Sequence, residues 1–401
     1  MSKILSVIAL ALTGLLITGC SSDEIKKPVA LDCPVEENPA FQSNTKSIAY
    51  RKILDDYVRR GLPGISLLVK DSTGFFIGSS GMADIAGNIP MQPCHMAKIA
   101  SVTKMMIGVT VMRLQEKGVL SLNDPVNKYI PENTLKKIGN GNAPVTIRNL
   151  MNHTTGFYDV IGDRGFYLQI LNDPTRKWTA GELLEYVYNK EAMFSFRPAD
   201  TVGYSNTNYL LISMVIESAT GVPHAVVFRD EVISRLSMND TRYYWHDPLP
   251  ETGVARGYYD LYNNGSIGDI TNWNTGSGNG YTGVYSTVWD MYLFADALFE
   301  SKTLLSQPSL DEMLTFHPDI EERKQIGVAC FKDFIDIGNP ERDFAWGHRG
   351  RELGYSADLY YFPEYKATMA LIVNYGTDGN SSLRPVFLEM RDKIARTITQ
   401  N

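Results

Sequence analysis

The chain has 401 residues, of which 44% are hydrophobic and 21% charged, and its formal net charge at pH 7 is −7. This length and apolar content suffice for one large domain or two ordinary domains with a buried core. The negative balance gives no basis for a nucleic-acid partner, and no run of like charges stands out. The six histidines are scattered and the four cysteines form no CxxC pair, so the sequence predicts neither a metal site nor a cofactor.

The N-terminus has the features of an export signal. A short basic start precedes an apolar run over residues 4–18, which is too short to span a bilayer. The run ends in Leu16-Ile-Thr-Gly-Cys20, which resembles a bacterial lipobox, where the chain is cut before a cysteine that then carries lipid. We therefore expect residues 1–19 to be a lipoprotein signal peptide and Cys20 to anchor the protein in the bacterial cell envelope, periplasmic or surface-exposed, at the outer membrane. An uncleaved anchor or a plain signal is the alternative.

Polar residues with three prolines fill positions 20–45 and favour a tether between membrane and fold. If Cys20 is lipidated, Cys33, Cys94 and Cys330 remain. These three cysteines can form one disulfide and leave one free thiol, or form no disulfide, and the sequence does not assign a pair.

Hydrophobic spacing divides the remaining chain into three parts. The first, residues 46–124, predicts a helix over 45–61, a hairpin with strands at 65–69 and 75–78, and a helix over 99–114. The second, residues 125–290, is richer in helix and loop signals, with expected helices at 145–151, 179–188, 209–218 and 286–298 and a glycine-rich loop over 258–282. Thr146 and Thr179 are expected N-caps, the latter with Glu182 in a capping box.

The last part, residues 291–401, predicts a meander of antiparallel strands followed by a helix. The strands are expected at 326–334, 344–348, 355–362 and 367–375, and the helix at 383–398. The simplest arrangement is a discontinuous α/β domain, formed by 46–124 and 291–401, that is interrupted by an inserted helical domain over 125–290.

Ser101 and Lys104 are the first candidate functional pair. They are three residues apart at the start of an apolar helix, so they share one face with Cβ atoms about 5–6 Å apart. A buried ammonium is costly unless something uses it, and a desolvated lysine loses its proton readily. This pattern favours an activated serine nucleophile. The same spacing recurs at Ser43 and Lys46, in a polar stretch where it has no such context.

Two further motifs follow in order along the chain. Tyr204-Ser-Asn206 precedes an apolar helix, and His348-Arg-Gly350 lies at the end of an expected strand. With Ser101-x-x-Lys104, these motifs resemble the serine β-lactamase and penicillin-binding protein superfamily, which includes class C β-lactamases, D-alanyl-D-alanine carboxypeptidases and related esterases. Single matches are weak, because Tyr262-Asn-Asn264 and Lys137-Ile-Gly139 also fit, but the order and spacing of all three are specific.

The resemblance implies a β-lactamase/transpeptidase-like fold, an antiparallel sheet flanked by helices, and a role for each residue of the motifs. Ser101 would attack a carbonyl and become acylated, and Lys104 would take its proton or hold a neighbouring base active. Tyr204 would act as base and as acid toward the leaving group. Asn206 would hydrogen-bond Lys104 or the substrate. The backbone N–H groups of Ser101 and Arg351 would form the oxyanion hole.

His348 departs from the class C β-lactamase pattern, which has lysine there. A histidine is largely neutral at pH 7, which removes a fixed cation from the wall beside Gly350, where these two residues would contact substrate. The departure favours a D-peptidase or esterase acting on a D-amino-acid peptide or ester. A β-lactamase and a non-catalytic penicillin- or peptide-binding protein are the alternatives. His153 is expected to be structural, and Arg349 or Arg351 could bind a substrate carboxylate. The oligomeric state is not predicted.

Overall fold

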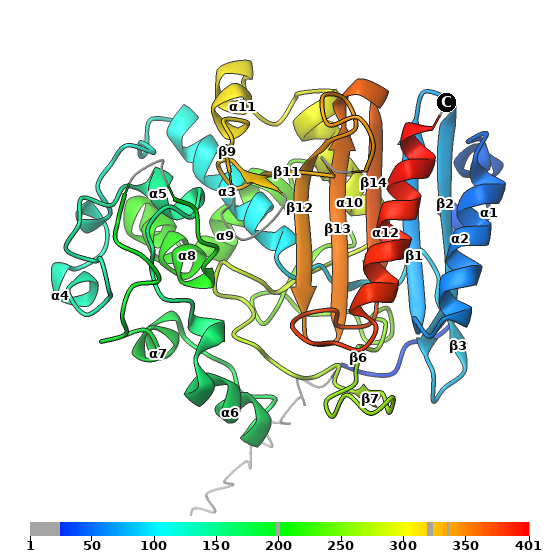
Figure 1. Ribbon diagram of the computed structural model, residues 1–401, viewed down its shortest axis with the longest axis horizontal. Helices are drawn as coiled ribbons and strands as arrows, with labels where there is room; N and C mark the ends of the chain where they lie inside the picture. Colours follow the sequence, from blue (N-terminus) through cyan, green and yellow to red (C-terminus); the bar gives the residue numbers. More distant parts are fainter. Residues whose placement is uncertain (1–24, 198–200, 319–323, 335–336, 401) are drawn as a thin grey trace, which may run out of the picture.

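A nine-stranded antiparallel sheet forms the centre of the computed structural model, which describes residues 25–197, 201–318, 324–334 and 337–400. The predicted signal peptide and Cys20 lie outside the described residues. The strand order is β3-β2-β1-β14-β13-β12-β11-β10-β9 (Figure 1). The strands are β1 Gly64–Asp71, β2 Gly74–Asp84, β3 Ile89–Pro90, β9 His317–Pro318, β10 Gln325–Ile326, β11 Phe331–Asp333, β12 Ala345–Glu352, β13 Tyr355–Phe362 and β14 Ala367–Val373.

Helices cover both faces of this sheet, which is why β13 and β14 are buried along their whole length. On one face lie α2 (Ser47–Arg59) and α12 (Arg384–Thr399), packed against each other (Figure 1). On the other face lie α3 (Val102–Glu116) and α10 (Val288–Ala295). The expected class, an antiparallel sheet flanked by helices with additional helices inserted, is confirmed.

The inserted region continues the core that α3 begins. Every residue of α3 from Val102 to Leu114 is buried, and one hydrophobic cluster runs from β1 and β2 through α3 into the inserted helices. The remaining helices are α1 Pro34–Glu37, α4 Glu132–Leu135, α5 Ile147–Met151, α6 Arg164–Asn172, α7 Ala180–Glu185, α8 Asn206–Thr220, α9 His224–Phe228 and α11 Gln307–Met313. Two small sheets complete the region, with strands β4 Ala97–Lys98, β5 Arg242–Tyr243 and β8 Val284–Ser286 in one and β6 Tyr258–Tyr259 and β7 Gly268–Asp269 in the other.

Local signals placed several helix ends correctly. Thr146 and Thr179 both accept a hydrogen bond from the third helical backbone N–H, and Glu182 closes the second capping box. Gly221 ends α8 in the left-handed region at φ 69°, which glycine adopts without steric cost. These caps depend only on neighbouring residues, so the sequence suffices to predict them.

The single strand expected at 326–334 is wrong. The chain forms β10, turns at Ala329 with φ +59°, and returns as β11. The turn is pressed against α3, where a Cβ on Gly108 would come within 2.1 Å of the Ala329 Cβ. The missing side chain at Gly108 therefore makes room for a turn that the local apolar pattern did not reveal.

The described part of the expected tether, residues 25–45, is packed on the fold, which corrects that expectation. Cys33 and Cys94 form a disulfide, and His95 Nε2 lies 2.8 Å from the carbonyl oxygen of Val29. Ile25 is buried as well. The expected resumption of the α/β part at residue 291 is also displaced, because it falls inside α10, which packs on the sheet.

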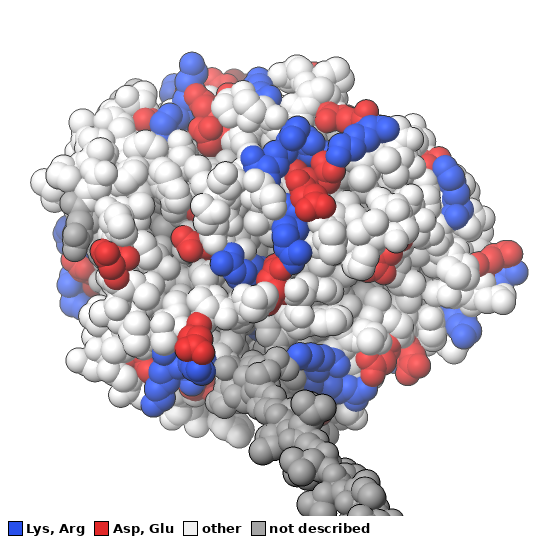
Figure 2. All heavy atoms as spheres, turned by 180° about the vertical axis from the view of Figure 1, so that it is seen from behind, with Lys and Arg blue, Asp and Glu red and all other residues white. Residues whose placement is uncertain are grey.

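Acidic and basic side chains are mixed over the face opposite to that of Figure 1 (Figure 2). Among the described residues, no single helix is long and apolar enough to cross a bilayer. The pair Asn206–Thr220 and His224–Ile233 passes that test jointly, by length and composition, with a bend of 88°.

Opening the Cys33–Cys94 disulfide should destabilise the fold. It closes a loop with a sequence separation of 61, and by loop-closure entropy such a crosslink contributes about 2–4 kcal/mol. We expect the Cys33→Ser/Cys94→Ser variant to lose this amount of unfolding free energy in urea titrations. A reducing agent should lower the stability of the wild type to that of the variant and leave the variant unchanged. Equal stability of wild type and variant under oxidising conditions would contradict the prediction.

Candidate active site

Ser101 and Lys104 lie in contact at the start of α3. Ser101 is the N-cap residue, and Lys104 Nζ lies 2.9 Å from its Oγ. Lys104 is fully buried, whereas Ser101 is half-buried and lines a cavity. The residue before the serine, Ala100, has φ +48°, a strained conformation for a non-glycine residue that persists only where its surroundings enforce it.

The Lys104 amine has two further partners from distant parts of the chain. It donates to Asn206 Oδ1 at 2.7 Å and to the Tyr281 carbonyl at 2.7 Å. The Asn206 amide in turn donates to both carboxylate oxygens of Asp159 at 3.1 Å. A continuous hydrogen-bond chain therefore runs from Asp159 through Asn206 and Lys104 to Ser101.

Burial changes the proton affinity of Lys104. Loss of hydration lowers the pKa of its amine from 10.5 to about 7, against the opposing attraction of the carboxylates of Asp159, Glu352 and Asp378. A substantial fraction of the amine is therefore unprotonated at neutral pH. In that form it can accept the hydroxyl proton of Ser101.

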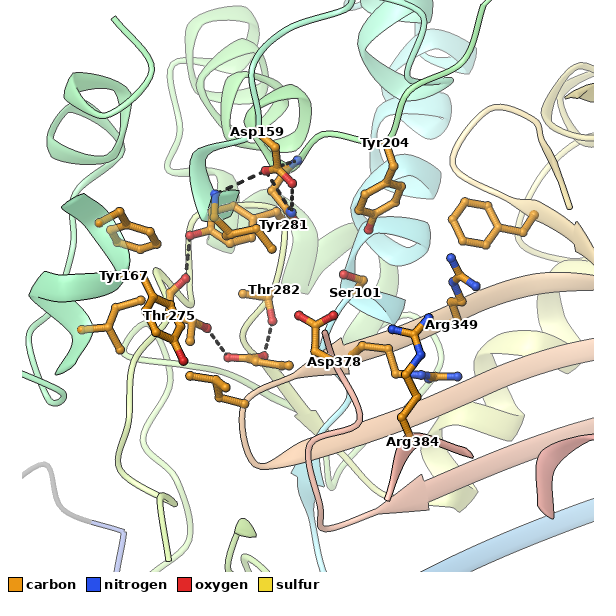
Figure 3. Close-up of a pocket in the computed structure, with 18 of the residues that line it drawn as sticks. Ser101, Asp159, Tyr167, Tyr204, Thr275, Tyr281, Thr282, Arg349, Asp378 and Arg384 are labelled. Carbon is orange, nitrogen blue, oxygen red and sulfur yellow. Dashed lines mark hydrogen bonds between the residues drawn. The ribbon is translucent and has the colours of Figure 1, made fainter. Parts of the chain in front are cut away.

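Tyr204 reaches the site from the loop before α8. Its ring stacks on His153 with centroids 4.4 Å apart, and Lys104 Nζ lies 5.1 Å from the ring centroid. Its hydroxyl points toward Ser101 (Figure 3) and has no hydrogen-bond partner among the described residues. Burial raises the pKa of Tyr204 well above its ordinary value, so the phenol is protonated and available as a donor.

His153 has the contacts of a structural residue. Its Nδ1 accepts a hydrogen bond from the backbone N–H of Ser205 at 3.2 Å and lies 3.1 Å from Asn208 Nδ2. Burial, and then the charge of Lys104, lower the pKa of His153 well below its usual value. The neutral ring thereby fixes the backbone on which Tyr204 and Asn206 sit.

His348 and Gly350 lie on β12, beside the start of α3. His348 is buried and stacks on Phe331 with centroids 4.1 Å apart, and its Nδ1 is 2.7 Å from the Arg349 carbonyl. Burial, and then Lys104, lower its pKa well below 6.5. A Cβ on Gly350 would lie 2.2 Å from the Ile99 carbonyl oxygen, so this glycine gives β12 close approach to the nucleophile's own backbone. The substrate contact that the family resemblance implies for Gly350 stays a prediction.

The two arginines of β12 differ in their contacts. The Arg351 guanidinium donates to Asp358 at 2.8 Å and lies over the Phe387 ring, so it is engaged within the fold. Its side chain is therefore not the free carboxylate-binding group that the sequence allowed. Arg349 and Arg384 of α12 line the cavity (Figure 3), and Arg351 contributes to its lining as well.

The cavity beside Ser101 measures about 320 Å³ and brings together residues that the sequence had not singled out. Its lining includes Asp159, Ile161, Phe166, Tyr167, Ile170, Thr275, Tyr281, Thr282, Glu352, Leu353, Asp378, Arg384 and Leu388. Asp159 follows His153 by six residues, but nothing local indicates its contact with Asn206. Across the described ranges, no group of three or more histidine, cysteine, aspartate or glutamate side chains is placed to hold a metal ion.

The second Ser-x-x-Lys copy has a structural use. Lys46 Nζ donates to the carbonyl oxygens of Thr397 and Ile398 near the end of α12, at 2.9 and 3.1 Å. A cation stabilises the C-terminal end of a helix. The copy is thus separate from the cavity, as its polar context had suggested.

Comparison with known proteins agrees with this geometry. A sequence model of the Beta-lactamase family matches residues 50–385. Penicillin-binding protein 4* of Bacillus subtilis (strain 168) is 26% identical over 323 residues, which cover 75% of this chain and 65% of that protein. D-alanyl-D-alanine-carboxypeptidase/endopeptidase AmpH of Escherichia coli (strain K12) is 27% identical over 255 residues, which cover 64% of this chain and 62% of that protein. The matches thus span less than two thirds of either relative.

Similarity extends to solved structures. The D-amino acid amidase from Ochrobactrum anthropi SV3, complexed with L-phenylalanine amide, superposes with a TM-score of 0.75 at 27% identity, covering 88% of this chain and 98% of that one. The resemblance seen in the three motifs is therefore confirmed, and the chain belongs to the Beta-lactamase family.

Proposed function

We propose that the protein is a secreted, membrane-anchored serine hydrolase that forms an acyl-enzyme on Ser101 and acts on D-amino-acid peptides, amides or esters. One observation carries the proposal. The Ser101 hydroxyl lies 2.9 Å from a fully buried lysine amine whose pKa is lowered to about 7, at the wall of a cavity. A hydroxyl next to a base of this strength is an activated nucleophile.

Acylation follows from these contacts. The unprotonated amine of Lys104 accepts the proton of Ser101 Oγ as that oxygen bonds to the substrate carbonyl carbon. The resulting ammonium is stabilised by Asn206 Oδ1 and the Tyr281 carbonyl, and the positive end of α3 favours the negative charge that develops nearby. The family resemblance assigns the oxyanion to the backbone N–H groups of Ser101 and Arg351.

Tyr204 is suited to protonate the leaving group. Its phenol is un-ionised, directed at Ser101 and free of other hydrogen bonds within the described chain. We propose that the phenol gives its proton to the departing amine and regains one from the Lys104 ammonium. Water then attacks the acyl-enzyme by the same groups in reverse, which frees Ser101 and the acid product.

Two features of the cavity support a peptide-like substrate. β11 pairs with β12 only as far as Gly347, so among the described strands residues 348–352 pair with β13 alone, and the edge of β12 toward the cavity has no strand partner there. A free strand edge can bind an extended backbone. The cavity also offers an apolar wall from α6 and its flank and cationic groups from Arg349 and Arg384. These suit an apolar side chain and an anionic group respectively.

The names of the relatives support the same chemistry. They include a carboxypeptidase for D-alanyl-D-alanine and an amidase for D-amino acids. A β-lactamase is the second candidate, and a binding protein without turnover is a third from another class. The complete assembly of Ser101, Lys104, Tyr204 and Asn206 favours an enzyme over the third candidate.

The location in the cell envelope, periplasmic or surface-exposed, is proposed from the N-terminal sequence and supported by one contact. Disulfides form in oxidising compartments, and Cys33 and Cys94 are bonded. The lipobox-like Leu16-Ile-Thr-Gly-Cys20 adds the membrane anchor to this proposal.

Ser101→Ala should abolish acylation and leave the fold intact. We expect benzylpenicillin to add its mass to the wild-type protein, with the adduct mapped to Ser101, and no adduct on the variant. Turnover of D-phenylalanine amide should fall by at least about 10³-fold, because the nucleophile is gone. Intact-protein mass spectrometry and an ammonia assay make these measurements, and circular dichroism checks folding.

The same incubations of the wild-type protein distinguish the candidate functions. A lasting adduct supports a penicillin-binding D-peptidase, and hydrolysed penicillin without an adduct supports a β-lactamase. Hydrolysis of D-phenylalanine amide but not of its L-isomer supports the D-specific amidase. A wild type that binds penicillin reversibly, without adduct or product, would point to the binding protein.

The pH profile should report Lys104. Because the base must be unprotonated, the acylation rate constant should rise about tenfold per pH unit below pH 7 and level off above it. Lys104→Arg, which stays protonated, should lower the rate by about 10²–10⁴-fold at pH 7. The rise of the rate constant below pH 7 is the acidic limb of the pH profile. His348→Gln should leave this limb in place, since the pKa of His348 lies well below that range. A limb that disappears in His348→Gln would reassign it to the histidine.

Lipidation can be tested on the full-length chain. We expect a Gram-negative host grown with labelled palmitate to incorporate label into the wild type and fractionate it with membranes. Cys20→Ala should lose both the label and the membrane association, because the sulfur that accepts lipid is absent. Label retained in Cys20→Ala would refute the lipobox interpretation.

A further inference from the structure

A second lysine–carboxylate pair lies beside the proposed nucleophile. Lys98 Nζ and Glu352 Oε1 are 3.4 Å apart, with side chains only 2% and 5% exposed. Breaking a buried pair by removing one partner is strongly destabilising, whereas a buried pair as such is weak evidence for stability. The proposed mechanism does not use either residue, so their presence calls for another explanation.

Hydroxyl groups complete the surroundings of Glu352. Its carboxylate accepts hydrogen bonds from Thr275 at 2.5 Å, Ser277 at 3.1 Å and Thr282 at 2.5 Å, two of which are drawn in Figure 3. Lys98 Nζ also donates to the Trp273 carbonyl at 2.8 Å. The pair thus fastens the segment from 273 to 282, which also supplies the Tyr281 carbonyl that receives Lys104.

The positions of the two residues in the chain suggest what the pair holds. Lys98 precedes Ser101 by three residues, and Glu352 directly follows Arg351, whose backbone N–H the family resemblance places in the oxyanion hole. The two are 254 residues apart in sequence. Between them, the Gly350 position lies against the Ile99 carbonyl, and the strained Ala100 leads into Ser101.

At Glu352, within the part of the chain that the structure describes, β12 has a neighbouring strand on one side only. Residues 348–352 of β12 pair with β13, and no other described strand pairs with them on the side of the cavity. The hydrogen bonds of β13 therefore do not fix the distance between this strand and the start of α3. The Lys98–Glu352 pair bridges that junction directly.

We propose that Lys98 and Glu352 are positioning residues. They hold the 348–352 part of β12, which carries the Arg351 backbone N–H, at a fixed distance from Ser101. The inference rests on the proposed acyl transfer at Ser101. Neither side chain reacts. Their ion pair fixes the separation between the attacking oxygen and the donors that receive the oxyanion, and a misplacement of about 1 Å at such a site can cost about 10²-fold in rate.

Three variants separate position from charge. Glu352→Gln and Lys98→Met each remove one charge with little change in shape, and the double variant removes both. We expect each to lower the acylation rate constant of Ser101 with benzylpenicillin by about 10–100-fold while the dissociation constant of the first complex stays unchanged. The readout is the time course of adduct mass, normalised to folded protein.

The pH limb supplies a readout that a purely structural role would not move. The carboxylates that act on Lys104 are Asp159, Glu352 and Asp378, and the neighbouring His153 and His348 are neutral. Glu352→Gln removes negative charge, so the limb should shift to lower pH. Lys98→Met leaves Glu352 uncompensated, so the limb should shift to higher pH. In the double variant the limb should return while acylation stays slow, because the bridge is missing.

A matched control is available at the other end of α3. Arg113 and Glu231 form another buried ion pair, at 2.9 Å, twelve residues or about 18 Å along the helix from Ser101. Glu231→Gln should destabilise the protein and leave acylation and its pH limb unchanged. If the charge variants do not fold, Thr275→Val and Thr282→Val loosen Glu352 without stranding a charge and should still slow acylation severalfold.

Folded variants that acylate at the wild-type rate with an unmoved limb would overturn the inference. Slowing of Glu231→Gln to the same extent would do so as well, since it would show a general effect of lost stability. Failure of the proposed function looks different, because the wild type itself would then remain unacylated at Ser101, and the positioning role would fall with it.

Discussion

Burial of the Lys104 amine is the constraint on which the rest of the site depends. An ammonium removed from water must be hydrogen-bonded or lose its proton, and here both occur. Ser101, Asn206 and the Tyr281 carbonyl surround the nitrogen, and its pKa lies near 7. The helix that carries it is buried over its first thirteen residues, and the Lys104 side chain itself is fully buried.

Several carboxylates near that amine raise its pKa against the effect of burial. Asp159 is itself buried, which raises its pKa, and it is bonded to the Asn206 amide. Glu352 keeps a lowered pKa, because Lys98 and three hydroxyl groups outweigh the effect of burial. The pKa of Lys104 therefore lies between that of an exposed lysine and that of a buried lysine without carboxylates nearby. A value near neutrality suits a group that must both accept and return a proton.

The two faces of strand β12 contact different parts of the protein. Gly350 and Glu352 face the start of α3, and the Arg351 guanidinium is held on the other side by Asp358, which also bonds Arg391 of α12. Successive side chains of a strand point to opposite faces, so one short segment can be fixed from both. His348 adds no positive charge to this wall, and the arginines that line the cavity are Arg349, Arg384 and Arg351, the last of which is paired with Asp358.

The amino-acid sequence by itself determined the elements whose signals are local, and the order of the three motifs. It predicted α2, the β1–β2 hairpin, the N-cap at Thr146, the capping box at Thr179 and the last helix, because each depends on residues within a few positions. It failed for the strand at 326–334, where the turn at Ala329 is dictated by contact with Gly108 on a distant helix.

Only the tertiary structure decided the distances and charges of the site. Lys104 meets Asn206 across 102 residues and Tyr281 across 177, and Lys98 meets Glu352 across 254. The partner of Cys33, the packing of residues 25–45 and the role of Asp159 were equally beyond local pattern. The physical reason is the same in each case. Desolvation, and hence the pKa of Lys104, depends on how closely remote segments pack, and no short stretch of sequence encodes that packing.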